Sequence, residues 1–315
     1  MTKNKQLTVS CKIDLKQVVQ DLSKMRNPDS GVRAVSAIRP ARGLSLLEMF
    51  AEEVRFLRNS GAQATPVITM LLTKLGVPSE GPLAKAALGV GRLVENAADE
   101  PNYHNKQHVI EVIVAAYVLG LREKLPIYRV VELIIGAAAH DLGHTGVMNR
   151  HDYEREAYSF QIAEPALREA HLTPDSIQRI EKMLLATDFR VGVPPTRNEY
   201  LETHSLPNND DRKLLAVQCL LLTEADVLFS CFDLHYNDLL SKLLSAEWQR
   251  PSFNLSLKER IGFLERVRFM SSASIALGLE TRRLALLDQL NKMLASHSSH
   301  SKEATGAHSA KPPTT

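Results

Sequence analysis

A histidine followed directly by an aspartate, His140 and Asp141, is the clearest sign of chemistry in this sequence of 315 residues. The pair ends an apolar run within residues 137–149 (AAAHDLGHTGVMN), and His144 lies four residues after His140. An imidazole beside a carboxylate suits a divalent cation that acts as a Lewis acid. A closed structural zinc site usually takes more thiolates. The segment therefore predicts part of a metal centre.

Two further apolar segments carry residues of the metal-binding type. His104 and His108 lie four apart in YHNKQH (103–108), so on a helix both rings would share one face. Asp226 lies inside a very apolar segment, and a buried aspartate is costly unless it is paired or bound to a metal. Three apolar helices that each direct ligands inward are typical of di-metal sites in helical bundles.

The composition favours a cytoplasmic protein with a large buried core. Hydrophobic residues make up 44% of the chain, and the formal net charge of +2 favours neither nucleic acid nor an anionic membrane as partner. The three cysteines lack CxxC spacing, which predicts reduced thiols. No apolar run reaches the roughly 18 residues of a membrane span, and residues 1–17 lack the apolar segment of a signal peptide.

Three regions differ in composition. Residues 1–45 form a basic leader, partly helical at 15–25, which either binds a partner or an anionic surface or is simply solvated. Residues 46–295 form the helical domain, and the polar, low-complexity residues 296–315 are expected to be a disordered tail.

Helical periodicity dominates residues 46–295, and sustained strand alternation is absent. The fold class is therefore expected to be all-α. We expect helices at about 44–58, 66–75, 83–98, 104–122, 126–141, 152–169, 173–187, 212–232, 235–246 and 256–293. Residues 189–212, with three prolines, are expected to be a long loop that is either a wall or lid of the site or a plain surface excursion.

The ordered motifs YHNxxH (103–108), HDxxHxxxxN (140–149), LATD (185–188) and AD (225–226) resemble the catalytic domain of class I 3′,5′-cyclic nucleotide phosphodiesterases. This family is a branch of the HD-type metal-dependent phosphohydrolases, and the resemblance covers roughly residues 100–265. It implies a compact multi-helix bundle with a di-metal site. The activity it implies is hydrolysis of cAMP, cGMP or both to the 5′-monophosphate.

The resemblance also implies the roles of the ligands. His108, His140, Asp141 and Asp226 would hold a first metal, zinc or iron, and Asp141 would bridge to a second metal, magnesium or manganese. A hydroxide shared by the two metals would attack the phosphorus. His104 matches the family's proton donor for the leaving ribose oxygen.

Other positions match residues near the second metal or residues that hold its waters and orient His104: His144, Glu156, Thr187 and Asp188. Three of them, Glu156, Thr187 and Asp188, have ordinary structural alternatives. Glu156 could be an exposed helix glutamate like its neighbour Glu154, and Thr187 and Asp188 could form a turn at a helix end. Asn149, the last residue of its motif, could equally be a helix-terminating residue.

The substrate pocket departs from the family. Tyr103 and Phe263 match substrate-binding residues, but Arg260 stands where the family has a glutamine. Arginine only donates hydrogen bonds, so it can address guanine but cannot accept from adenine. We therefore expect a guanine bias or another phosphate substrate, unless Arg260 points outward and pairs with a neighbouring glutamate, Glu259 or Glu265. The segment TEADVLFS around Asp226 also lacks the histidine and the Ser-Asn-Pro that the family usually has there.

Two alternatives stay open. The chain could be an HD-type phosphohydrolase that acts on another nucleotide or phosphate ester, or a metal-binding regulatory module with low activity. The expected partner is a small cyclic nucleotide, and the sequence leaves the oligomeric state undetermined.

Overall fold

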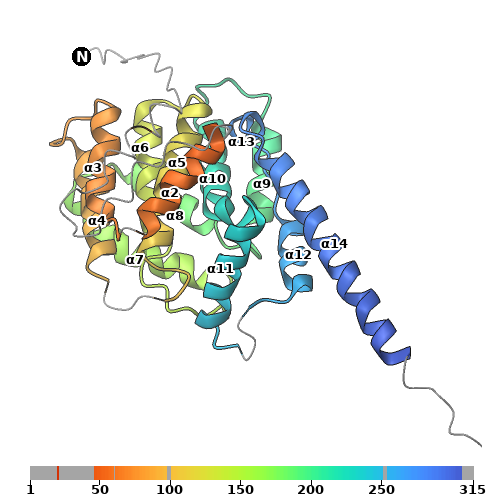
Figure 1. The fold of residues 1–315 in the computed structure, drawn as a ribbon. Coiled ribbons are helices and arrows are strands. Elements are labelled where there is room, and N and C mark those ends of the chain that lie inside the picture. Colours follow the sequence, from red (N-terminus) through yellow and green to blue (C-terminus); the bar gives the residue numbers. More distant parts are fainter. Residues whose placement is uncertain (1–19, 21–45, 60, 98–100, 251–253, 307–315) are drawn as a thin grey trace, which may run out of the picture.

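The computed structural model describes residues 20, 46–59, 61–97, 101–250 and 254–306. Every regular element among these residues is a helix, which confirms the expected all-α fold (Figure 1). The elements are α2 (Leu46–Asn59), α3 (Ala64–Lys74), α4 (Pro82–Glu95), α5 (Lys106–Arg122), α6 (Ile127–Ala139), α7 (Glu154–Glu169), α8 (Pro174–Leu185), α9 (Val193–Thr203), α10 (Asp211–Val227), the 3₁₀ turn η1 (Phe229–Cys231), α11 (Leu234–Glu247), α12 (Leu257–Arg266), α13 (Ser272–Ala276) and α14 (Leu279–Gly306). The helix expected at 15–25 lies outside the described residues apart from Gln20.

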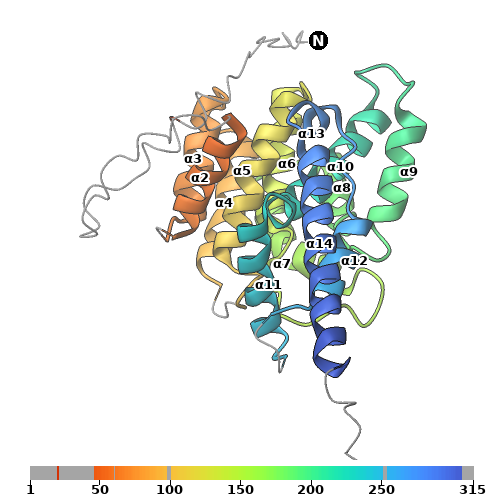
Figure 2. The ribbon, with the colours of Figure 1, turned by 45° about the vertical axis from the view of Figure 1, so that its right-hand side comes forward.

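Helices α5, α6 and α10 form the centre of the bundle. Every residue of α5 from His108 to Gly120 is buried, and so is every residue of α6 from Arg129 to Ala139. A helix that is apolar on all sides must be surrounded by other elements. Helices α2, α3 and α4 lie on one side of this centre and α9 lies on the other (Figure 2). No helix in the described part of the chain is long and apolar enough to cross a membrane.

The charges inside α6 are neutralised by its neighbours. Glu132 is buried and accepts hydrogen bonds from Arg129 at 2.9 Å and from Arg179 of α8 at 2.9 Å. Burial opposes ionisation of Glu132, but the two guanidinium groups hold the pKa of Glu132 below its usual value. Arg129 also bonds to Asp211 at the start of α10. These ion pairs fasten α6, α8 and α10 together.

The single helix expected at 256–293 is wrong, because three helices occupy that stretch. The chain leaves α12 at Val267 in an extended conformation, and Gly278 adopts a left-handed conformation before α14. Buried Glu224 of α10 fixes the turn between α12 and α13. Its carboxylate accepts from the amides of Met270 and Ser271 at 2.5 and 3.0 Å. It also accepts from the hydroxyls of Ser271 and Ser274 at 2.5 and 2.6 Å.

The loop expected at 189–212 contains a helix, α9. Pro194 and Pro195 fall in its first turn, where a proline costs no hydrogen bond and its fixed φ suits the helix. The proline pair therefore starts a helix here, and the expected irregular loop is wrong for residues 193–203. Figure 2 shows α9 at the edge of the bundle.

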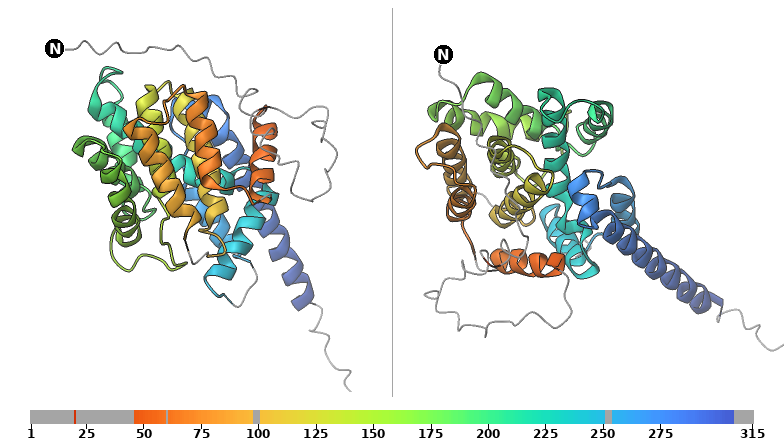
Figure 3. Two further views of the ribbon diagram at one scale, coloured as in Figure 1. Left: turned by 90° about the vertical axis from the view of Figure 1, so that its left-hand side faces the viewer. Right: turned by 90° about the horizontal axis from the view of Figure 1, so that it is seen from above.

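The expected disordered tail also differs in part. Helix α14 continues to Gly306, ten residues beyond Ser296, and projects from the body of the molecule (Figure 1; Figure 3, right). Residues 307–315 lie outside the described part of the chain.

Glu224→Ala should lower the free energy of unfolding by roughly 2–4 kcal/mol, because it leaves buried donors of the α12–α13 turn without an acceptor. Urea unfolding followed by circular dichroism measures this change. Glu169→Ala, at an exposed position near the end of α7, is the matched control and should change stability by less than about 0.5 kcal/mol. Equal stability of the two variants would contradict the role of Glu224.

Candidate metal centre

Three elements place the four expected ligands. The side chain of Asn105 caps α5 by accepting from the amides of Gln107 and His108, which fixes the helix start that carries His108. His140 follows the last residue of α6. Asp226 lies in the last turn of α10. Ligands at helix ends have fixed positions because the helices behind them are packed on all sides.

The four side chains converge as expected. His108 Nε2 lies 3.0 Å from Asp226 Oδ1 and 3.4 Å from His140 Nε2. His140 Nε2 lies 3.1 Å from Asp141 Oδ2 and 3.6 Å from Asp226 Oδ1. Nitrogen and oxygen atoms from sites 118 residues apart in sequence thus meet around one point.

The hydrogen bonds around these ligands favour a cation. His140 Nδ1 donates to the Ala137 carbonyl at 2.8 Å, which directs Nε2 at the cluster. Asp141 Oδ2 is buried and accepts no hydrogen bond. A buried carboxylate oxygen without a donor needs a compensating positive charge. Burial opposes ionisation of Asp141, but the charges of His140 and His104 hold its pKa well below the usual value.

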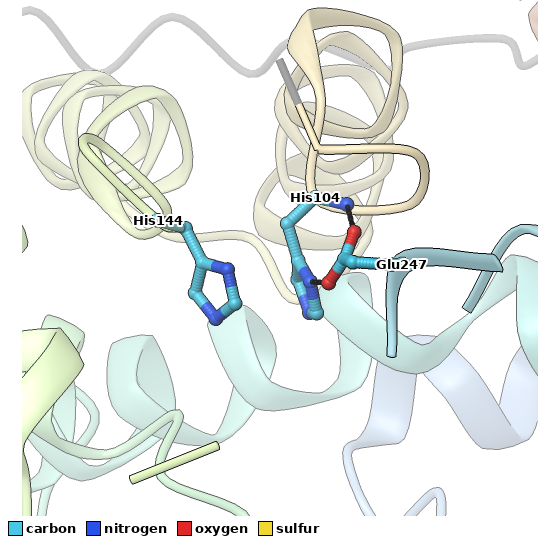
Figure 4. Close-up of side chains that lie close together, drawn as sticks. All are labelled: His104, His144 and Glu247. Atoms are coloured by element: carbon cyan, nitrogen blue, oxygen red, sulfur yellow. Dashed lines mark hydrogen bonds and ion pairs between the residues drawn. The ribbon is translucent and has the colours of Figure 1, made fainter. Parts of the chain in front are cut away.

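His104 lies beside this cluster and is held by Glu247 (Figure 4). His104 Nδ1 donates to Glu247 Oε1 at 2.5 Å, and Glu247 Oε2 accepts from the amides of Tyr103 and His104 at 2.7 and 3.0 Å. Burial lowers the pKa of His104, but the negative charges of Asp141 and Glu247 raise it more, so the net shift is upward. The surroundings of His104 therefore favour the charged form of the ring.

His104 and His108 do not share one helix face, contrary to expectation. His104 precedes Asn105, the capping residue of α5, so it lies in the bend before the helix. Its ring contacts that of His144 instead, with centroids 3.8 Å apart (Figure 4). Burial and the nearby charge of His104 lower the pKa of His144 to about 4, so His144 is neutral.

Ligand-type atoms of His104, His144 and Glu247 also lie within 4.8 Å of one another. The hydrogen bond between His104 and Glu247 already accounts for this group without an ion. Gly146 makes the approach of Glu247 possible, because a Cβ added at Gly146 would lie 2.7 Å from Glu247 Cγ, and because its φ of +76° suits glycine. The bend at residues 144–146 therefore leaves room for the Glu247 side chain.

Asn149 joins two of the residues expected near a second metal. Its Nδ2 donates to Glu156 Oε2 at 2.8 Å and to Asp188 Oδ2 at 2.9 Å. Asp188 also accepts from three backbone amides, which lower its pKa although burial opposes this. Burial raises the pKa of Glu156, whereas neighbouring Glu154 accepts a hydrogen bond from the Arg150 amide at 2.7 Å. Glu156, not Glu154, thus faces this network.

The expected substrate residues occupy different environments. Phe263 stacks on Phe189 with ring centroids 5.4 Å apart. Arg260 is buried and donates to Asn237 at 2.7 Å and to Asp238 at 3.2 Å, so the alternative that it points outward and pairs with Glu259 or Glu265 is wrong.

Two of the remaining residues have hydrogen bonds that tie them to the surrounding helices. The Tyr103 hydroxyl is bonded to Ser230 Oγ at 3.2 Å, and its ring contacts those of His104 and His108. Thr187 Oγ1 donates to the Leu184 carbonyl at 2.7 Å.

Glu247 is the residue that we did not single out from the sequence. It lies 143 residues from His104, in the ordinary helical stretch LLSAEWQR, and no local pattern marks it. The size of a cavity does not locate the candidate site either. A cavity of about 620 Å³ between α8, α9 and α10 contains none of the expected catalytic or metal-binding residues.

Comparison with known proteins agrees with this geometry. Residues 103–163 match the family model described as 3′5′-cyclic nucleotide phosphodiesterase. The solved structure of LmjPDEB1 in complex with IBMX is 16% identical, with a TM-score of 0.58, and the match covers 80% of this chain and 88% of that chain. The phosphodiesterase domain of the RhoPDE fusion protein from the choanoflagellate Salpingoeca rosetta is 18% identical, with a TM-score of 0.53 and coverage of 81% and 93%.

A search of curated proteins finds no match. At these identities the two solved structures establish a shared fold, and the family model adds the sequence signature of the segment that carries His104, His108, His140 and Asp141. Together they support the resemblance expected from the sequence: residues 103–163 are similar to the 3′5′-cyclic nucleotide phosphodiesterase family, and the fold is shared with two phosphodiesterase structures.

Proposed function

We propose that this chain hydrolyses a 3′,5′-cyclic nucleotide to the 5′-monophosphate, using two divalent cations and His104 as general acid. One observation carries the proposal. Four metal-type ligands converge in the interior, one of them with an oxygen that no donor satisfies, and beside them lies His104, whose pKa is raised.

The ligand set fits a first cation of the zinc or iron type, held by His108, His140, Asp141 and Asp226. We assign a second cation, magnesium or manganese, to Asp141 together with Glu156 and Asp188, the carboxylates that Asn149 joins and that influence one another electrostatically. Bound cations supply the Lewis acidity that lowers the pKa of water and neutralises phosphoryl oxygens. His144 and Thr187 are polar neighbours suited to holding water there.

His104 performs the proton transfer. As the bond from phosphorus to the ribose 3′ oxygen breaks, that oxygen gains negative charge and needs a proton, which the protonated ring can donate. Glu247 accepts from Nδ1 and so directs the other ring nitrogen, Nε2, away from itself and leaves it free for the substrate. A carboxylate in this position both orients the ring and stabilises its charged form.

Base selectivity follows from Arg260. Its Nε and Nη1 are bound to α11, while Nη2 is buried and has no partner. We propose that Nη2 donates to guanine O6, which favours cGMP over cAMP, because an arginine cannot accept from the adenine amino group.

A hydrolysis panel tests the function. Purified protein stripped by a chelator should be inactive, and Mn²⁺ or Mg²⁺ together with Zn²⁺ should restore hydrolysis of cGMP and, more slowly, of cAMP. Chromatography of the nucleotide products measures both rates. Turnover confined to a nucleoside 5′-monophosphate or to bis(p-nitrophenyl) phosphate would show instead a phosphohydrolase with another substrate, and equal rates for cAMP and cGMP would contradict the role of Arg260.

His104→Ala should reduce kcat by about 10²–10⁴-fold, because the leaving oxygen loses its proton donor. The bound metal, measured by atomic absorption, should be unchanged, since His104 is not among the four ligands. His235→Ala, at an exposed position of α11, is the control and should retain full activity. Unchanged turnover in His104→Ala would show that the assigned role is wrong.

Glu247→Gln should move the alkaline limb of the pH–rate profile to lower pH. The active form of His104 is the protonated one, so the rate falls as the pH rises through the pKa of His104. The charge of Glu247 is one of the causes that raise this pKa, and glutamine keeps an acceptor but removes the charge. Steady-state rates between pH 5 and 10 measure the shift. An alkaline limb that stays in place would mean that Glu247 does not set the pKa of His104.

A further inference from the structure

The cavity between α8, α9 and α10 offers apolar surface to a ligand away from the metal centre. Its volume of about 620 Å³ falls within the roughly 300–1,000 Å³ that is typical of pockets for small molecules. The apolar part of its walls includes Leu185, Ala186, Leu215, Ala216 and Cys219. The two alanines and the cysteine are buried, and the two leucines are half-buried. A ligand with an apolar body would therefore remove much of this surface from water.

Most polar side chains that line the cavity are already bonded to the protein. The hydroxyls of Tyr153 and Thr196 each donate to a backbone carbonyl, at 3.1 and 2.8 Å. Arg212 Nε and Nη2 donate to the two oxygens of Glu199, at 2.6 and 3.1 Å. A nucleobase or a ribose needs several donors and acceptors to replace its bonds to water. These walls therefore do not suit a second nucleotide.

Lys182 is the exception among these polar side chains. It is exposed at the solvent side of the cavity, and its ammonium group makes no hydrogen bond or ion pair within the part of the chain that the structure describes. The hydrogen bond from Arg212 and, less strongly, the charge of Lys182 lower the pKa of Glu199, so the ammonium lies near that carboxylate. Because Arg212 binds both oxygens of Glu199, Lys182 is left to attract an anion.

Two residues of the cavity wall also hold a residue of the proposed centre, Asp188. The Tyr153 amide donates to Asp188 Oδ2 at 3.0 Å, and the Gly192 amide donates to the Asp188 carbonyl at 2.8 Å. Tyr153 has a φ of +60°, which is uncommon for a residue other than glycine and persists only where contacts hold it. A ligand in the cavity would thus contact the backbone segments that hold Asp188.

We propose that this cavity binds an amphipathic monoanion, a molecule with one carboxylate and an apolar chain, such as a medium-chain fatty acid. The carboxylate pairs with Lys182, and the chain covers the apolar walls. The binding site goes beyond the proposed function and does not depend on it. Only the coupling of this site to turnover, through Tyr153 and Asp188, rests on the proposed function.

A series of three ligands tests the chemistry of the cavity. Calorimetry with the metal-loaded full chain should show binding of decanoate at concentrations below those at which it forms micelles. Acetate has the same carboxylate without the apolar chain and should bind at least a hundredfold more weakly. 1-Decanol has the chain without the charge and should bind at least threefold more weakly. Acetate that binds as tightly as decanoate would show that the carboxylate binds a metal instead, and would overturn the proposal.

Variants locate the site. Lys182→Glu should weaken binding of decanoate at least threefold, and Lys182→Arg should retain it. Ala216→Leu should weaken it at least fivefold, because the larger side chain occupies part of the apolar wall. Lys85→Glu, at an exposed position of α4 outside the cavity, is the control and should bind decanoate like the wild type. The proposal is overturned if the wild type does not bind decanoate, or if Lys182→Glu and Ala216→Leu bind it as tightly as the wild type.

Turnover tests the coupling to Asp188. Saturating decanoate should change kcat for cGMP at least twofold in the wild type, and less in Lys182→Glu at the same concentration. Binding of decanoate without any change in kcat would support the site and contradict its coupling through Tyr153. A chain that hydrolyses no cyclic nucleotide would overturn the proposed function and leave the calorimetric result standing.

Discussion

The fold is built around a buried cluster of ionisable side chains, which is unstable in a protein interior unless its charges are compensated. Two carboxylates and two imidazoles meet within hydrogen-bond distance, and Asp141 Oδ2 has no donor. Such a cluster is stable only if a cation compensates it and if its surroundings are too rigid to relax. The apolar helices α5, α6 and α10 provide that rigidity, because they are packed on all sides and carry the ligands at their ends.

The segment between α6 and α7 contains several of the candidate site residues, and its backbone turns determine where their side chains lie. Gly143, Gly146 and Tyr153 all have positive φ, which folds the chain back twice within eleven residues. The first bend admits Glu247 against Gly146, and the second places the Tyr153 amide on Asp188. These turns connect the surroundings of His104, the proposed proton donor, with the network around Asn149, so that both sides of the proposed reaction depend on one loop.

Local sequence patterns predicted the all-α fold and pointed to the four side chains that converge, since an apolar helix with a single inward carboxylate or imidazole is visible within twenty residues. They could not predict Glu247, whose partner His104 lies 143 residues away. The break between α12 and α13 was missed for the same reason, because it depends on Glu224 of a distant helix. The prediction of a loop at residues 189–212 was wrong for a different reason. Prolines are common in loops, but in the first turn of a helix they favour the helix, here α9.

The hydrogen-bond partners of the buried and half-buried arginines show which of them have donors left for a ligand, which motif position alone does not show. Arg260 occupies the position of the family's glutamine, yet two of its three nitrogens are bound to Asn237 and Asp238, so most of its hydrogen-bonding capacity serves α11. Arg197 and Arg268 match no motif; neither pairs with a carboxylate among the described residues, and both line a narrow crevice together with Asp226. A buried charged group without an acceptor gains most from a ligand, so an unsatisfied donor such as Arg260 Nη2 is a candidate for ligand binding that sequence register alone does not reveal.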